Sequence, residues 1–211
     1  MSEKLSLVLA DLEEQAVLEL VDKGLANGDD PDAIMTACRE GMALVGQRYE
    51  TGEYFISDLM MAGAILKQVA DILSPRLKAG GAPTGGKVVV GTVAGDIHDI
   101  GKDIVVVMLR SADYEVFDLG VDVPPQRFVD ALKETGATVL GLSGLLTIAF
   151  DAMKGTVEAV AAAGLRPGVR VMIGGGTVNE TVRGYTGADA CGADAQAAVN
   201  LCHQWMKEAG R

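Results

Sequence analysis

Residues 87–119 read KVVVGTVAGDIHDIGKDIVVVMLRSADYEVFDL, and this stretch decides the fold class. Its β-branched run Val88–Thr92 predicts a buried strand, and the apolar residues of Ile100–Ser111 recur at helical spacing. The run Glu115–Leu119 predicts a second strand, so the stretch forms one strand–helix–strand unit. Two strands joined through a helix run parallel, which predicts an α/β domain with helices covering its sheet.

The same alternation of strand and helix continues to the end of the chain. Further strands are expected at Val139–Leu142, Val169–Ile173 and near Ala190, with helices at Pro125–Thr135, Phe150–Ala163, about Asn179–Tyr185 and Ala193–Glu208. We therefore predict a five-stranded parallel domain over residues 87–211, flavodoxin-like (Rossmann-like) with strand order 2-1-3-4-5.

Residues 1–77 follow a different pattern, in which apolar residues recur at the spacing of helices throughout. Four helices are expected, which begin near Ser2, at a capping box formed by Asp11 and Glu14, at Asp30–Pro31, and at Ser57 as the cap. This half is predicted to be a four-helix bundle. The Gly- and Pro-rich residues 78–86 are predicted to link it to the α/β domain.

Composition and charge limit the classes of partner. The chain has 18 Lys and Arg against 29 Asp and Glu, which gives a formal net charge of −11. An acidic surface repels nucleic-acid phosphates and anionic lipid, so neither nucleic acid nor a membrane surface is an expected partner. The nearly apolar residues 139–150 are too few to span a bilayer. The amino terminus has no signal-peptide pattern, and the three scattered cysteines indicate a reducing cytoplasm.

Three unusual segments follow strands that meet at one edge of the predicted sheet. They are GDIHDIG at 95–101, SGLLT at 143–147 and GGG at 174–176. In the order 2-1-3-4-5 the first and third strands are neighbours where the strand order reverses, and the fourth strand lies beside the third. Because ligands of open α/β sheets bind at this point, we expect these segments to build the functional site.

The residue types in these segments suggest a single-histidine site. The chain has two histidines, so a zinc or iron site with several histidines cannot form. His98 can act as a general base, or as the one axial ligand of a metal that brings its other ligands with it. Asp96 can accept the proton of the second imidazole nitrogen, and Ser143 can extend this relay to Asp96. Taken singly, each feature has a more ordinary interpretation. His98 would cap a helix, Ser143 would be a hydroxyl at the end of a strand, and Gly174–Gly176 would form a tight turn.

The sequence Asp96-Ile97-His98-Asp99-Ile100-Gly101, with Ser143-Gly144-Leu145 and Gly174–Gly176 after it, resembles the D-x-H-x-x-G, S-x-L and G-G pattern of cobalamin-binding proteins. The separations between the three elements also match. Residues 1–77 resemble the helical cap of methyl-carrying members, above all Gly52–Phe55 leading into Ile56–Lys67. The layout is most similar to the small corrinoid proteins of cobalamin-dependent methyltransferase systems and to the corresponding region of cobalamin-dependent methionine synthase.

The resemblance implies a corrinoid methyl carrier that is not catalytic by itself. Cobalamin would bind base-off, with His98 as the cobalt ligand and with Asp96 and Ser143 completing a relay. The implied cofactor contacts are Asp96, Ile97, His98, Asp99, Ile100, Gly101, Ser143, Leu145, Thr147, Gly174, Gly175 and Gly176, the nucleotide tail lying beside the residues from Ser143 onward. Phe55 and Met60, with the neighbours of Met60 up to Ala62, would shield the methyl group.

The resemblance also implies partners. They would be a donor-specific methyltransferase, a second methyltransferase that uses tetrahydrofolate or a thiol coenzyme, and a reductive activase, with methylcobalamin as the loaded state. The methyl donor stays open among methanol, methylamines, betaines and methoxylated aromatics. Two other functions also stay open. The chain could be the cobalamin-binding subunit of an adenosylcobalamin-dependent mutase, against which the helical half counts. The chain could also be a cobalamin-dependent sensor. Such a sensor would be expected to carry a basic DNA-reading module, and the acidic charge of this chain counts against one.

Overall fold

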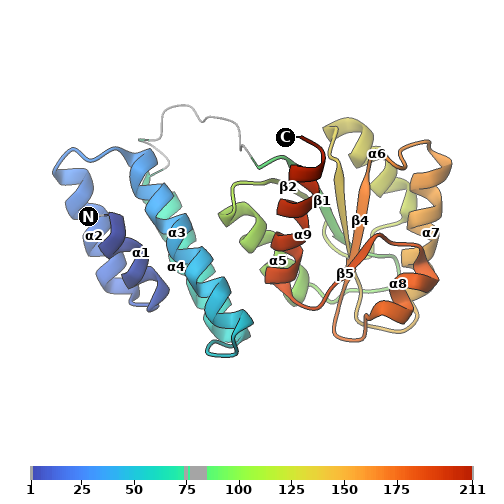
Figure 1. Cartoon of the computed structure of the whole chain (residues 1–211), viewed down its shortest axis with the longest axis horizontal. Helices are drawn as coiled ribbons and strands as arrows, with labels where there is room; N and C mark the ends of the chain where they lie inside the picture. The colour runs from blue at the N-terminus through green and yellow to red at the C-terminus, as the bar shows by residue number, and fades with distance from the viewer. Residues whose placement is uncertain (1, 74–75, 77–84, 211) are drawn as a thin grey trace. The chain divides into compact units, whose positions relative to one another are not determined.

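The computed structural model of the chain describes residues 2–73, 76 and 85–210 (Figure 1). The chain divides into two compact units, Met1–Ala82 and Pro83–Arg211. The predicted linker, residues 78–86, lies outside the described residues apart from Gly85 and Gly86. No helix in the described part of the chain combines the length and apolar character that a bilayer crossing needs.

The first unit is helical. It contains α1 (Ser2–Ala10), α2 (Glu14–Ala26), α3 (Pro31–Glu50) and α4 (Ile56–Leu73). The helix α3 packs against both α1 and α4, and buried apolar side chains from all of these helices form the core, including Leu9, Val21, Met42 and Val69. The helical cap predicted for this half of the chain is confirmed.

Two predicted helix starts in this unit have different outcomes. Asp30 caps α3 as expected, because its carboxylate accepts from the backbone N–H of Asp32 (3.3 Å) and Pro31 takes the first helical position. The predicted capping box at Asp11 is wrong. The carboxylate of Asp11 instead accepts a hydrogen bond from Arg48 (2.8 Å), and α2 begins without a side-chain cap.

The predicted cap at Ser57 is also wrong, since α4 begins at Ile56. The carboxylate of Asp58 accepts from the backbone N–H of Phe55 (2.7 Å), so the first turn is closed from inside the helix. The hydroxyl of Tyr54 donates to a carbonyl at the end of α1 (2.7 Å). These bonds fix the segment that leads into α4 and leave the side chain of Phe55 exposed.

The second unit alternates strands and helices. Its strands are β1 (Lys87–Thr92), β2 (Glu115–Asp118), β3 (Val139–Ser143), β4 (Arg170–Gly174) and β5 (Ala190–Gly192), and its helices are α5 (Ile100–Ser111), α6 (Pro125–Thr135), α7 (Ala149–Ala162), α8 (Glu180–Thr186) and α9 (Ala195–Glu208). The sheet is parallel with order β2-β1-β3-β4-β5. Figure 1 shows α5 and α9 on one face of the sheet and α6, α7 and α8 on the other. The predicted five-stranded parallel domain is confirmed.

The core of this unit keeps the central strands in register. Val89 of β1, Leu140 of β3 and Val171 of β4 are register partners, and all of them are buried. They form one apolar cluster with Phe128 of α6 and Met153 of α7. Burial of each such side chain contributes about 1.5–3 kcal/mol, so the strands cannot slide without a large loss of stability. The positions of the strand ends are fixed as a result.

Candidate functional site

The carboxyl edge of the sheet brings the three segments of the sequence analysis together. Thr92, Ser143 and Gly174 end β1, β3 and β4 and are register partners across these strands. The ladder continues into the loops, because the N–H of Val93 donates to the Ser143 carbonyl (3.0 Å) and that of Gly144 to the Gly174 carbonyl (3.1 Å). The three segments therefore leave the sheet side by side, as the topology predicts.

Asp96 organises the loop after β1. Its carboxylate is completely buried, and Oδ1 accepts hydrogen bonds from the backbone N–H of His98 (3.0 Å) and from the imidazole Nδ1 of His98 (2.7 Å). Its other oxygen, Oδ2, accepts from the backbone N–H groups of Leu145 (2.7 Å) and Leu146 (3.0 Å). One buried carboxylate thus joins the histidine to the loop after β3.

These hydrogen bonds determine the charge of Asp96. Burial favours the neutral acid and by itself raises the pKa of Asp96. The N–H groups of Leu146 and His98, the imidazole and the N–H of Leu145 all favour the carboxylate. Together they hold the pKa of Asp96 well below its usual range. An ionised carboxylate only accepts, so the hydrogen that it shares with His98 belongs to Nδ1.

The lone pair of the neutral imidazole therefore lies on Nε2. The His98 side chain is 48% exposed, and no group within the described residues is hydrogen-bonded to Nε2. A carboxylate on the far nitrogen fixes the tautomer and the ring orientation, and it makes the free nitrogen a stronger electron-pair donor. His98 is thus prepared to bind one metal atom, or to take one proton, from outside the loop.

Apolar side chains are also exposed at the edge of the sheet where His98 lies. On the loops that follow β1, β2 and β3, and at the first residue of α5, they are Ile97, Ile100, Val121, Leu145, Leu146 and Ile148. The two that flank His98 in sequence, Ile97 and Ile100, are 72% and 66% exposed. Several exposed apolar side chains on neighbouring loops that also carry a polar group are typical of a ligand site.

The glycines of the site have different surroundings. A Cβ atom at Gly101, in the first turn of α5, would meet nothing within 4 Å, so space is open beside the histidine loop. A Cβ atom at Gly175, which has φ +141, would overlap the carbonyl oxygen of Gly144. A Cβ atom at Gly176 would lie 3.2 Å from a methyl group of Leu145. The glycines after β4 thus allow their loop to pack on the loop after β3.

The predicted site residues are not all in contact. Within the described residues, no hydrogen bond links the hydroxyl of Ser143 to Asp96, so the serine part of the relay stays a prediction. Thr147 and Asp99 are exposed in the loops after β3 and β1. Phe55 and Met60 are exposed on the helical unit.

Sequence reasoning missed two residues beside the histidine loop. Asp122, in the loop after β2, accepts a hydrogen bond from the N–H of Gly95 (2.7 Å). Lys102 of α5 is buried, and its Nζ donates to Asp118 at the end of β2 (2.7 Å). An aspartate in a turn is a weak signal, and nothing in the spacing of Lys102 separates it from a surface lysine.

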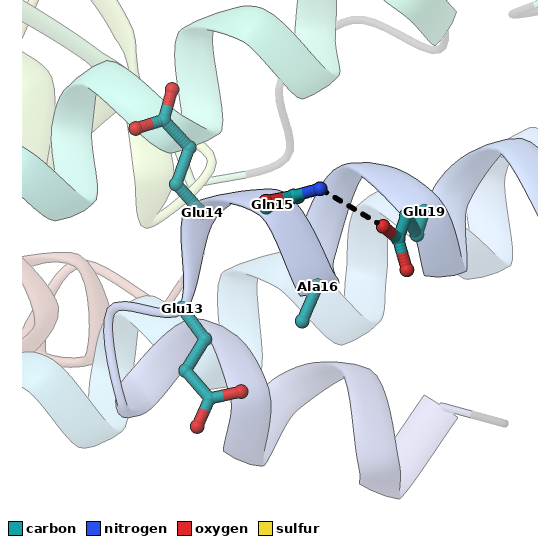
Figure 2. Close-up of a pocket in the computed structure, with 5 residues that line it drawn as sticks. All are labelled: Glu13, Glu14, Gln15, Ala16 and Glu19. Atoms are coloured by element: carbon teal, nitrogen blue, oxygen red, sulfur yellow. Dashed lines mark hydrogen bonds between the residues drawn. The ribbon is translucent and has the colours of Figure 1, made fainter.

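A shallow hollow on the helical unit is lined by Glu13, Glu14, Gln15, Ala16 and Glu19, as Figure 2 shows. The amide of Gln15 donates to the carboxylate of Glu19 (3.3 Å), and the polar side chains of the hollow are exposed. Its residues come from the start of α2 and its cap, so it shares no residue with the carboxyl edge of the sheet.

Comparison with known proteins gives a family match for both units. A family model described as B12 binding domain matches residues 86–201, and a second model with the same description matches residues 1–74. Among curated proteins, the chain is 38% identical over 186 residues to dimethylamine corrinoid protein 3 of Methanosarcina acetivorans. That match covers 88% of this chain and 87% of the relative.

Two solved structures are also similar. The crystal structure of a cobalamin-binding protein from Desulfitobacterium hafniense has 42% sequence identity and a TM-score of 0.80, and the match covers 97% of this chain and 98% of that one. The methanol:cobalamin methyltransferase complex MtaBC from Methanosarcina barkeri has 27% identity and a TM-score of 0.84, covering 96% of this chain and 78% of the matched chain.

Proposed function

The chain belongs to the B12-binding family of corrinoid proteins, and on that premise we propose that it is a methyl carrier in a multi-component methyltransferase system. The observation that carries the proposal is the pairing of Asp96 with His98, which engages Nδ1 and leaves Nε2 free at the carboxyl edge. Two similar proteins support it, one named a dimethylamine corrinoid protein and the other part of a methanol:cobalamin methyltransferase complex.

The residues at the carboxyl edge fit a corrinoid. Nε2 of His98 would supply one ligand to the cobalt, and the exposed Ile97 and Ile100 would present apolar surface to the macrocycle. The open space beside Gly101 leaves room for its edge. We assign the nucleotide tail to Ser143, Leu145, Thr147 and the glycines at 174–176, in the loops after β3 and β4.

The cobalt of a bound corrinoid supplies the chemistry, since it can accept a methyl group from one partner and pass it to another. The residues of this chain prepare His98 to bind the cobalt. Asp96 keeps a proton on Nδ1 of His98, and this fixes the tautomer in which Nε2 carries the lone pair.

We assign protection of the methyl group to the helical unit. Phe55 and Met60 are large apolar side chains that this unit leaves 70% and 54% exposed. Such exposure leaves them available to exclude water from a bound cofactor. Ala62, also expected to take part, is completely buried in the core of the helical unit, so its side chain is not available.

Selectivity for the methyl donor then belongs to partners. We propose a donor-specific methyltransferase, a second methyltransferase with tetrahydrofolate or a thiol coenzyme as methyl acceptor, and an activase that restores the reduced cobalt. The three scattered cysteines support a location in the reducing cytoplasm.

The assignment of His98 as a cobalt ligand is tested by the electron paramagnetic resonance spectrum of the reconstituted protein. The protein is labelled with ¹⁵N-histidine, loaded with unlabelled hydroxocobalamin and reduced to Co(II). Ligation by His98 should give a doublet splitting from ¹⁵N in place of the triplet that ¹⁴N gives. The doublet should disappear in His98→Ala and persist in His203→Ala, which removes the exposed histidine of α9. A triplet in the labelled protein would show that the cofactor keeps its own base.

The carrier role needs a second measurement. The holoprotein is mixed with a donor methyltransferase and its methyl donor, and formation of the methylated cofactor is followed by absorption. Transfer that requires His98 supports the proposal. Selective retention of adenosylcobalamin, with no methyl transfer from any donor system, would instead favour a mutase subunit or a sensor.

A further inference from the structure

The loop after β2 runs alongside the end of β1. The N–H of Thr92 donates to the carbonyl of Gly120 (2.9 Å), and the N–H of Val123 donates to the carbonyl of Thr92 (3.0 Å). Val93 and Val123 form an isolated parallel bridge. These contacts bring Asp122, the residue before Val123, against the histidine loop.

Asp122 makes two hydrogen bonds to the residues that precede the histidine. Its Oδ1 accepts from the N–H of Gly95 (2.7 Å), and its own N–H donates to the carbonyl of Asp96 (3.0 Å). The N–H of Gly95 belongs to the peptide unit before Gly95, and the carbonyl of Asp96 belongs to the peptide unit after Asp96, so the two bonds restrain the peptide units on both sides of the Gly95–Asp96 link. Because the carboxylate of Asp96 holds the imidazole of His98, the orientation of the imidazole depends on these two peptide units.

The backbone of Asp122 shows that its side chain has a use. Its φ of +52 lies in the left-handed region, which costs free energy for a residue with a Cβ atom. Glycine adopts this region freely, as Gly95 (φ +81) and Gly120 (φ +82) do nearby. A glycine at this position could not accept the hydrogen bond from Gly95. A glycine at position 122 would be less strained, but it would lack the carboxylate that accepts this hydrogen bond.

The beginning of the same loop is attached to the helix that follows the histidine. Oδ2 of Asp118 accepts from Nζ of Lys102, a residue of α5 that is only 3% exposed (2.7 Å). Oδ1 of Asp118 accepts from the N–H of Gly120 (2.9 Å). The loop after β2 is thus bonded both to the loop before His98 and to the helix after it.

We propose that Asp122 is a positioning residue for His98. It holds the peptide units that flank the Gly95–Asp96 link, and thereby positions Nε2 of His98 for the metal of a bound corrinoid. The inference rests on the proposed function and adds to it a support from the loop after β2. Loss of the Oδ1 acceptor should let the Asp96–His98 pair move and should reduce the ratio of histidine-bound to histidine-free cobalt about tenfold.

Three variants separate the hydrogen bond from the backbone conformation. Asp122→Gly removes the acceptor and also relieves the left-handed strain, whereas Asp122→Asn keeps an acceptor oxygen and tolerates this conformation. Asp113→Gly is the matched control. Asp113 also has a left-handed backbone (φ +69), but it lies in the turn between α5 and β2, at the opposite edge of the sheet.

The variants are measured with and without the cofactor. In protein loaded with hydroxocobalamin and reduced to Co(II), the splitting from ¹⁵N-histidine gives the histidine-bound fraction. In the apoprotein, amide hydrogen exchange reports the bonds that His98, Leu145 and Leu146 donate to Asp96. We expect Asp122→Gly to lower the bound-to-free ratio and to speed exchange at these amides, each about tenfold. Asp122→Asn and Asp113→Gly should match the wild-type protein.

Two outcomes would overturn the inference. One is wild-type ligation and wild-type exchange in Asp122→Gly, and the other is an Asp122→Asn protein as impaired as the glycine variant. A wild-type protein without any histidine signal would refute the proposed ligation instead. The exchange rates of the apoprotein then decide by themselves whether Asp122 holds the Asp96–His98 pair.

Discussion

The hydroxyl of Thr92 donates a hydrogen bond to the backbone carbonyl of His98, with 3.0 Å between the oxygen atoms. Thr92 is the last residue of β1 and is completely buried. The strand end therefore holds the backbone of the histidine, while Asp96 holds its side chain. Main chain and imidazole of His98 are restrained by separate partners.

Replacement of Thr92 by Val should lower the free energy of unfolding by about 1 kcal/mol, because the shape is kept and one hydrogen bond is lost. Denaturation by urea, followed by fluorescence, reports this unit, since the one tryptophan of the chain is Trp205 on α9. Thr156→Val is the control, because Thr156 is equally buried and donates within α7. Both variants should lose stability, and only Thr92→Val should change histidine ligation. Equal ligation in the two would contradict the prediction.

Asp96→Asn should remove an acid-dependent part of the stability. The pKa of Asp96 is lower in the folded chain than in the unfolded one, so ionised Asp96 stabilises the fold at pH values above about 4. This contribution is lost as the pH falls below that value toward the pKa of the folded state. We expect Asp96→Asn to be less stable by about 2 kcal/mol near neutral pH. The difference from wild type should shrink on acidification, and a constant difference would refute this account.

Gly175→Ala should destabilise the α/β unit by about 3 kcal/mol or more, since a Cβ atom would overlap the Gly144 carbonyl at a backbone conformation that favours glycine. Gly155→Ala is the matched control. A Cβ atom at Gly155 of α7 would meet nothing within 4 Å, and alanine should stabilise the helix by up to about 1 kcal/mol. Urea denaturation measures both. A Gly175→Ala protein of wild-type stability would mean that the two loops are not packed together.

Gly101→Ala should separate stability from cofactor binding. The added methyl group enters open space at the start of α5, so the free energy of unfolding should change by less than about 1 kcal/mol. If the corrinoid occupies this space, the affinity for hydroxocobalamin should fall roughly ten- to a hundredfold. Equilibrium dialysis measures the affinity. Unchanged binding would show that the space beside Gly101 is not used by the cofactor.

The fold could be predicted from the sequence because strand and helix leave different periodicities. The proline and aspartate at 30–31 also marked a helix start correctly, since Asp30 has only its local backbone to cap. Asp11 failed as a cap because Arg48, distant in sequence, takes its carboxylate. The cap predicted at Ser57 failed for a local reason, because α4 begins at Ile56 and the neighbouring Asp58 accepts from the N–H of Phe55.

The meeting of the three segments at one edge of the sheet could also be predicted, and so could the pairing of Asp96 with His98, but the other hydrogen bonds of Asp96 could not. The pairing of Asp96 with His98 follows from a spacing of two residues. The groups that complete the environment of Asp96 are backbone N–H groups of Leu145 and Leu146, which no side-chain pattern reveals. The burial of Lys102 likewise depends on Asp118, which only the folded sheet brings within reach.

The use of main-chain donors at positions 145 and 146 has a consequence for inherited variation. Every amino acid except proline carries a backbone N–H, so the support of Asp96 survives almost any replacement at either position. The side chain at position 146 can therefore change without loss of this support, whereas that of Leu145 is also proposed to contact the nucleotide tail. Proline alone would remove a donor, and at either position it would leave Asp96 with three of its four hydrogen bonds.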